Sequence, residues 1–395
     1  MPSNSSSRSN VQPARTQSPL RSQSSTPTST PPGSRPGTSS SNGSTSSTNL
    51  DILTGVRVVL QDQPDPLKVT NLQPTSRYFR ITVFALHRAL SMLETSRGRY
   101  VLSNIGVEEC ESWGPRAAKS LVFKQNPKAN PNAMKDYVNE WLQKLRRNAP
   151  TVTISDRIQG DGVTQRLDWG NSPSEYIVTK AVLFRVNKIL LDNIITAANR
   201  KNTANFERSL FFLTLTIAHE LIHVFTGYIT GDALRNTPPA VNHPRGLSGS
   251  MRPGEAGRAW ERGFIGYITK SYFDSNDPLG TAQAGIMYAC EVETRGYVIK
   301  QAWIKQFLQG NVTTLTLQNG LEVNASGKPV ALTSAMKTME STRPSGKQKG
   351  TDDVYETIDV INELPLVRVG SAELKSILGI ATDMTKIMAA QRNVG

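Results

Sequence analysis

Cysteine is nearly missing from this chain of 395 residues, and its N-terminal region has no apolar stretch. The two cysteines, Cys110 and Cys290, are far apart, which excludes a disulfide-stabilised scaffold and a cysteine-rich zinc module. We expect both to be buried, reduced thiols. A secretory signal needs an apolar segment near the N-terminus, and none is present. We therefore expect an intracellular protein, cytoplasmic or nuclear.

Acidic side chains are missing from residues 1–50, where Ser, Thr and Pro occupy 31 positions. Such a segment has too few apolar groups to offset its chain entropy, which predicts a disordered tail over 1–50. Residues 51–395 are long enough for one large domain. The formal charge of the chain is +13, but its basic residues are scattered and form small clusters only at 144–147 and 343–349. Nucleic-acid binding is therefore not expected.

Apolar residues after position 51 recur mostly at three- and four-residue intervals, the spacing of amphipathic helices. Alternation within 178–190 predicts a strand that leads into a helix, and 312–333 predicts short strands or a hairpin. The fold class is therefore α+β, a predominantly helical domain with a small sheet behind the tail. Residues 56–60 and 77–93 are expected to be the first ordered elements, the second of them helical towards its end. The predicted helices cover residues 132–147, 192–200, 207–227, 258–272, 287–308 and 371–391.

One segment, residues 209–230, is long enough to cross a membrane, but His219, Glu220 and His223 lie at its centre. Charge at the middle of a bilayer is costly, so we expect no transmembrane helix and no membrane association. Glu220 is the only charged residue between positions 209 and 231. A buried carboxylate without a partner destabilises a fold strongly, and a bound cation would remove that cost.

The motif His219-Glu220-Leu221-Ile222-His223 has the spacing that a metal site on a helix requires. Residues four apart lie on one helix face, so both imidazoles can reach one ion while Glu220 lies beside them. The alternative is a set of hydrogen-bonded polar residues in the core without a metal. The lone His87 lies among apolar residues, and we expect a structural role for it.

In its apolar frame the motif resembles the active-site helix of the zincin metallopeptidases. The resemblance implies a zincin-like fold, a zinc ion held by His219 and His223, and Glu220 as general base on a zinc-bound water. It also implies a peptide or protein substrate. The metzincin branch would need Gly and His where this chain has Thr226 and Ile229. The gluzincin branch, whose third ligand is a Glu on the next helix, is the better match.

The third metal ligand is expected downstream, on a helix over about 255–272, and the candidates are Glu255, Glu261 and His243. Glu255 is favoured because small residues follow it, as they do in gluzincins where the two helices pack together. Glu261 could instead support a ligand or pair with Arg258. Gluzincins often have an acidic residue four positions after the third ligand. If Glu255 is that ligand, this position is Ala259.

Further downstream, residues 254–261, 277–280 and 283–286 are similar to a set of uncharacterised fungal HExxH proteins. This similarity supports the zincin interpretation but brings no substrate with it. A zincin also needs a donor for the developing oxyanion, and the candidates are Tyr267, Tyr288, His243 and Arg258. The alternative function is a non-catalytic protein of zincin-like fold that binds a peptide or protein partner in its cleft.

Overall fold

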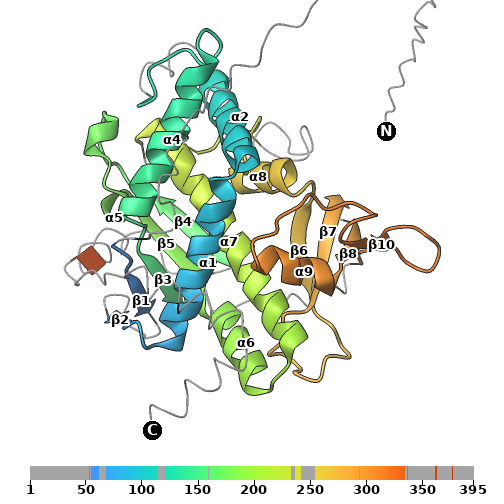
Figure 1. Cartoon of the computed structure of the whole chain (residues 1–395). Coiled ribbons are helices and arrows are strands. Elements are labelled where there is room, and N and C mark those ends of the chain that lie inside the picture. The colour runs from blue at the N-terminus through green and yellow to red at the C-terminus, as the bar shows by residue number, and fades with distance from the viewer. Residues whose placement is uncertain are drawn as a thin grey trace, which may run out of the picture. The chain divides into compact units, whose positions relative to one another are not determined.

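The computed structural model of this chain describes residues 53, 55–61, 68–113, 121–158, 160–232, 236–241, 254–292, 294–333, 336, 361, 362 and 376. All of these fall within one compact unit, Thr48–Gly395. They form helices packed with two small sheets (Figure 1). The α+β class is therefore confirmed, whereas the expectation of one small sheet is wrong. The predicted tail over 1–50 lies outside the described residues, as does the helix over 371–391 except for position 376.

The first sheet has the strand order β2-β1-β3-β5-β4. Strands β1, β3 and β5 are parallel, while β2 and β4 run antiparallel at the two edges. The parallel strands are largely buried and rich in Val, Ile, Leu and Phe, as expected when both faces of a sheet are covered. The strands of this sheet are β1 (Val58–Gln61), β2 (Thr70–Asn71), β3 (Val152–Ser155), β4 (Gly162–Arg166) and β5 (Val182–Asn187).

Two helices of the N-terminal half, α4 and α6, match predicted helices. Helix α4 begins where Asn130 accepts a hydrogen bond from the backbone N–H of Ala133, with Pro131 in its first turn. The switch from strand to helix after position 187 is present as β5 followed by α6. Helix α2 was not predicted. The helices of this half are α1 (Arg77–Leu93), α2 (Ser96–Ser112), α4 (Pro131–Arg147), α5 (Val178–Ala181) and α6 (Lys188–Asn199), with a 3-10 turn at Pro173–Glu175.

Helix α7 (Thr203–Thr230) contains the predicted helix over 207–227 and runs through the middle of the fold (Figure 1). It contacts α1, α6, α8, α9 and the edge strand β4. Aromatic rings pack along it: the centroid of Phe225 lies 5.0 Å from that of Trp141, and Phe211 lies 4.8 Å from Phe307. The helix is apolar and long enough to cross a membrane. However, 83 % of its most apolar stretch of 18 residues is buried within the protein, as in a core helix.

The second sheet is antiparallel, with the order β10-β8-β7-β6 and with β9 paired to β8. The helices predicted over 258–272 and 287–308 are therefore wrong in part, because strands occupy much of both ranges. The short strands expected within 312–333 are confirmed. The elements of this half are α8 (Ala256–Phe264), β6 (Ile268–Tyr272), β7 (Ile286–Val292), β8 (Arg295–Ile299), α9 (Gln301–Leu308), β9 (Leu321–Glu322) and β10 (Val330–Ala331).

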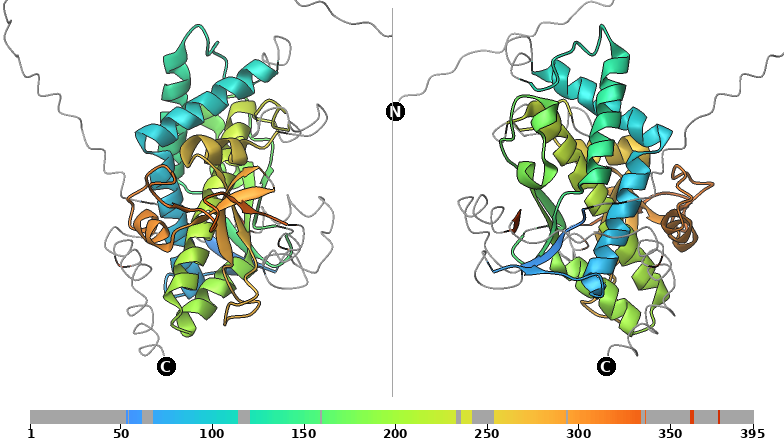
Figure 2. Two further views of the ribbon diagram at one scale, coloured as in Figure 1. Left: turned by 90° about the vertical axis from the view of Figure 1, so that its right-hand side faces the viewer. Right: turned by 60° about the vertical axis from the view of Figure 1, so that its left-hand side comes forward.

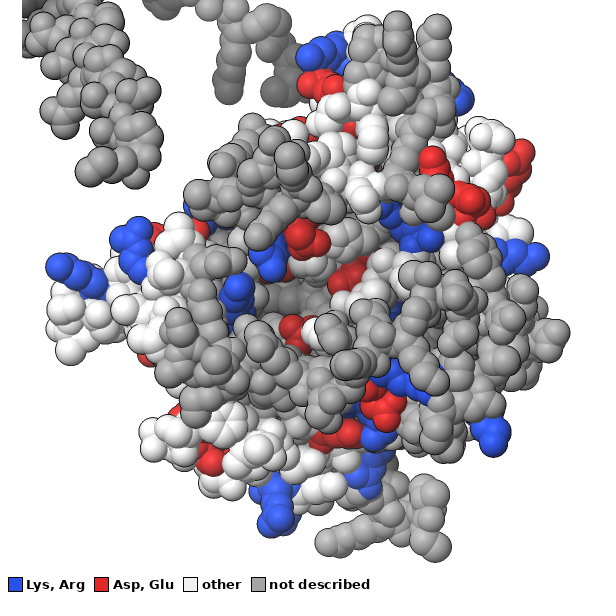
Figure 3. All heavy atoms as spheres, turned by 180° about the vertical axis from the view of Figure 1, so that it is seen from behind, with Lys and Arg blue, Asp and Glu red and all other residues white. Residues whose placement is uncertain are grey.

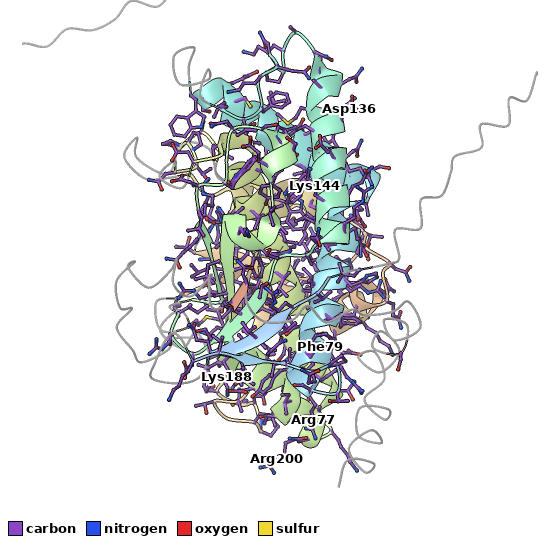
Figure 4. All side chains as sticks on the ribbon, turned by 90° about the vertical axis from the view of Figure 1, so that its left-hand side faces the viewer. Arg77, Phe79, Asp136, Lys144, Lys188 and Arg200 are labelled. Atoms are coloured by element: carbon purple, nitrogen blue, oxygen red, sulfur yellow. The ribbon has the colours of Figure 1, made fainter. Side chains whose placement is uncertain are left out.

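The two sheets lie on opposite sides of α7, and the two turned views bring each of them forward in turn (Figure 2). On the outer layer, Phe79 of α1 is buried, while Asp136 and Lys144 lie along the solvent side of α4 (Figure 4). At the end of the molecule where α1 begins, the Arg77 guanidinium donates a hydrogen bond to Asn199 of α6, 3.1 Å away. This layered packing holds α7 rigidly between the sheets.

Candidate metal centre

Helix α7 brings His219, Glu220 and His223 to one cleft, as their helical spacing predicts. The two imidazole side chains are 19 % and 18 % exposed, and Glu220 is buried at 7 %. The turns directly before and after them, residues 213–218 and 224–230, are buried in the core. The three polar side chains are thus fixed by a rigid helix but open to the solvent on one side.

Glu255 lies directly opposite the two histidines, at the position that precedes α8. Its backbone N–H donates to the carbonyl oxygen of Val241 at 2.8 Å, which fixes the start of this helix. Its side chain does not cap α8. The carboxylate instead lies between the imidazoles, with Oε2 at 3.1 Å from Nε2 of His219 and Oε1 at 2.9 Å from Nε2 of His223.

Gly257 allows α8 to approach α7 closely enough for this contact. A Cβ atom at position 257 would lie 2.3 Å from Cδ2 of His219, far inside van der Waals contact. Any side chain there would therefore displace either the ring or the helix. The small residues after Glu255 thus have the packing role on which the sequence argument relied.

Glu261 has a different place from Glu255, one turn and a half further along α8. Its Oε1 accepts a hydrogen bond from Nδ1 of His219 at 2.7 Å, and its Oε2 accepts one from the backbone N–H of Thr269 at 2.9 Å. Nδ1 of His219 is therefore occupied, and Nε2 is the nitrogen left to face Glu255. Glu261 fixes the orientation of the ring and ties it to strand β6, as carboxylates behind metal-binding histidines commonly do.

The charges of this group stabilise one another strongly. Burial alone would lower the pKa of His219, but the carboxylates of Glu255 and Glu261 outweigh burial and hold that pKa well above the usual 6.5. Burial alone would raise the pKa of Glu255, but the imidazoles of His219 and His223 hold it well below its usual range. The cluster therefore favours the protonated form of His219 and the ionised form of Glu255, and a metal ion bound there would replace the proton.

His219, His223 and Glu255 form a group that could hold a metal ion. One ligand atom from each lies within 4.8 Å of the others. In a tetrahedral zinc site with bonds of about 2.0–2.1 Å, ligand atoms are roughly 3.3 Å apart. The separations of 3.1 and 2.9 Å are close to that value. A cation could thus enter between these atoms with small side-chain movements.

The cleft in front of this group has a volume of about 390 Å³. The face of the molecule opposite to that of Figure 1 is hollowed near its middle, with acidic and basic side chains around the hollow (Figure 3). Helix α7 contributes the floor of the cleft, and residues of β4 and β6 contribute its walls. The cleft is lined by Asp161, Gly162, Phe212, Leu215, Thr216, His219, Glu220, His223, Glu255, Arg258, Glu261, Ile268, Thr269, Lys270 and Ser271.

Strand β4 comes very close to Glu220. A Cβ atom at Gly162 would lie 2.8 Å from Cγ of Glu220, so only glycine leaves this carboxylate its present place. The hydroxyl of Thr164 donates to the backbone carbonyl of Glu220 at 3.2 Å. This wall could not be predicted from the sequence, because β4 meets α7 only through long-range packing.

The four candidate oxyanion donors differ in whether they line the cleft. Arg258 lines the cleft, and its Nε is 3.6 Å from Oε2 of Glu255. Tyr267 packs instead against Tyr297 and Arg262, and Tyr288 is buried against Tyr272, so neither tyrosine lines the cleft. His243 lies outside the described residues. Of the four candidates, the structure thus brings Arg258 to the metal group.

Comparisons of this chain with protein-family models, with curated proteins and with solved structures find no match. The function is therefore inferred from the geometry and chemistry of the cleft.

Proposed function

We propose that this protein is a zinc-dependent metallopeptidase of zincin-like fold. His219, His223 and Glu255 would hold the metal, and Glu220 would be the general base. One observation carries the proposal: the Nε2 atoms of both histidines converge on the carboxylate of Glu255, at 3.1 and 2.9 Å, beside Glu220 in an open cleft.

Zinc is the metal that best fits these donors. Two imidazoles and one carboxylate form a ligand set of catalytic zinc sites, which leave a fourth position open for water or substrate. A zinc ion bound there would lower the pKa of a water molecule and polarise a substrate carbonyl. The open side of the cleft in front of the group leaves room for that fourth position.

Glu220 is well placed to move a proton. Within the described part of the chain its carboxylate accepts no hydrogen bond, although the residue is only 7 % exposed. A carboxylate in this state is available to accept a proton from an attacking water and to pass it to the leaving amine. Arg258 is the cleft residue best placed to stabilise a developing negative charge.

Strand β4 supplies a place for an extended peptide. Asn187 donates to the carbonyl of Asp161, and Leu167 donates to the carbonyl of Ala181, so the odd-numbered positions of β4 pair with β5. The backbone groups of the even-numbered positions therefore point away from β5, along the open edge of the sheet. A substrate strand could pair with this edge, and Gly162 would bring it beside Glu220.

The decisive experiment is the substitution Glu220→Gln. It removes the base but keeps the size of the side chain, so zinc content should stay at the wild-type level while peptide cleavage falls about 10²- to 10⁴-fold. Glu207→Gln, on the same helix but outside the cleft, is the matched control and should keep full activity. Cleavage of a peptide library, read by mass spectrometry, measures the effect. An unaltered cleavage rate in Glu220→Gln would refute the proposed role.

The alternative is a non-catalytic protein that binds a peptide partner in the same cleft. One observation favours it: neither Tyr267 nor Tyr288 lines the cleft, so the described tyrosine candidates supply no oxyanion donor. Wild-type protein that holds zinc and binds peptides but cleaves none of them would establish this alternative.

A further inference from the structure

The wall of the cleft that faces β4 is also the edge of a sheet. Strand β6 ends the order β10-β8-β7-β6, and its residues Ile268–Ser271 line the cleft. The N–H of Thr269 points away from β7 and donates to Glu261, which shows that the open edge of β6 faces the metal group. An extended chain in the cleft would therefore lie between two strand edges.

Lys270 is the basic residue of this wall. Side chains alternate along a strand, so Ile268 and Lys270 share one face of β6, and both are half-buried. Thr269 and Ser271, on the other face, are buried. Lys270 is thus the half-buried basic residue that β6 contributes to the cleft lining, on the same face of the strand as Ile268.

Within the described ranges, Lys270 has no carboxylate partner. The guanidinium of Arg258 already lies 3.6 Å from Glu255. The carboxylates of Glu255 and Glu261 are in turn held by the two histidines. Glu220 also lines the cleft, and no ion pair within the described ranges joins it to Lys270. The positive charge of Lys270 therefore remains for a ligand.

The floor beside Lys270 is apolar. Phe212 and Leu215 precede His219 by seven and four residues on α7, so they lie on the same face of the helix. Together with Ile268 they form the apolar part of the cleft lining, which also contains the metal group and Lys270. A group with a short hydrocarbon stem and a terminal carboxylate would match this surface.

We propose that Lys270 binds a carboxylate of the peptide substrate and thereby sets the specificity of the cleft. This inference rests on the proposed function and names its substrate class. The carboxylate belongs either to an acidic side chain or to the free C-terminus of the peptide, because both offer the same charge to the ammonium group. A lysine on an edge strand can also serve only to prevent edge-to-edge aggregation. The experiment below distinguishes this role from binding of a carboxylate.

The experiment measures peptide binding in the Glu220→Gln background, so that bound peptides are not consumed. Fluorescently labelled nonapeptide pools carry one Glu at a fixed position or Gln at the same position, each with a free or an amidated C-terminus. Anisotropy titrations of the zinc-loaded protein give the affinities. Lys270→Gln is the test variant, and Lys305→Gln, an exposed lysine on α9, is the matched control.

We expect pools with a carboxylate to bind about ten-fold more tightly than their neutral counterparts, as for one charge-assisted contact. Lys270→Gln should abolish this preference, and Lys305→Gln should retain it. A preference for Glu over Gln would identify a side chain as the source of the carboxylate, and a preference for the free C-terminus over the amide would identify the terminus. An unchanged preference in Lys270→Gln, or no preference in the parent protein, would overturn the inference.

The two proposals fail separately. A carboxylate preference that depends on Lys270, in a protein whose wild-type form cleaves none of these peptides, would support the Lys270 inference and refute the peptidase proposal. Cleavage of these peptides by the wild type, without any preference for a carboxylate, would support the peptidase proposal and refute the Lys270 inference.

Discussion

Two buried histidine environments on neighbouring helices have opposite electrostatic character. On α7, the carboxylates of Glu255 and Glu261 raise the pKa of His219 although it is buried. On α1, burial together with the guanidinium groups of Arg146 and Arg88 lowers the pKa of His87 to about 3. The same side chain is thus prepared for a positive charge in one place and kept neutral in the other. The neighbouring charges thus decide how readily each histidine holds a proton, and a metal ion bound at His219 would have to displace that proton.

The surroundings of His87 form a closed polar cluster. Arg146 donates to Nδ1 of His87 at 3.0 Å and makes two hydrogen bonds to Glu94, at 2.7 and 2.6 Å. The side chains of Arg146 and Glu94 are only 7 % and 6 % exposed. All three groups find partners within α1, α4 and the turn between α1 and α2. This closure supports the structural role expected for His87, whereas the cleft on α7 is open.

Breaking the closed cluster should have a large effect on stability. The substitution Arg146→Met leaves the buried carboxylate of Glu94 without its partner, and we expect it to lower the free energy of unfolding by about 3–5 kcal/mol. Urea unfolding followed by circular dichroism measures this loss. Lys144→Met, on the exposed side of the same helix, should change stability by less than about 0.5 kcal/mol. A similar, small loss for both variants would contradict the structural role of the cluster.

Weakening the open cluster should reduce metal affinity rather than stability. Glu261→Ala removes the hydrogen bond that orients His219, and we expect zinc affinity to fall about 10- to 100-fold. Competition with a chromophoric chelator measures the change. Glu291→Ala, on β7 and outside the cleft lining, provides the control. If Glu261→Ala bound zinc as tightly as the control, the orienting role of Glu261 would be wrong.

The smallest effect concerns the pH dependence of stability. His87 has a pKa of about 3 in the folded protein and about 6.5 when unfolded, so between these values the unfolded chain binds the extra proton. Its stabilising contribution is complete above pH 6.5 and is lost as the pH falls towards 3. The loss reaches about 1.4 kcal/mol one pH unit below 6.5.

His87→Gln keeps an acceptor for Arg146 but does not titrate, so its stability should fall less steeply between pH 6.5 and 5.5. Parallel urea titrations of both proteins at these two pH values make the comparison. Identical slopes for the two proteins would show that His87 is not kept neutral by its neighbours.

The sequence predicted the local parts of this molecule well. The helix that carries His219 and His223 followed from a long apolar segment with one motif, and the helix over 132–147 followed from its periodicity. Glu255 was favoured as the third ligand because small residues follow it, and the structure places it opposite both imidazoles. These features depend on neighbours within a few turns of one helix.

The parts that depend on distant neighbours were missed. Strands β6 and β7 were assigned to helices, although β7 contains good helix formers only at positions such as Met287 and Ala289, and the pairing between the two strands decides their structure. Helix α2 contains Gly98 and Gly106, which are weak helix formers, and it forms through packing on α4 and α8. The contact of Glu261 with Thr269 likewise requires the turn from α8 into β6.

The most direct test of the account is the metal content of the purified protein, measured by mass spectrometry for the wild type, His223→Ala and Glu255→Ala. Exposed Glu322, replaced by Ala, serves as the control. We predict about one zinc ion per chain in the wild type and in the control, and almost none in the two site variants. Wild-type protein that holds no zinc after reconstitution, or a Glu255→Ala variant that keeps it, would contradict the proposed metal centre.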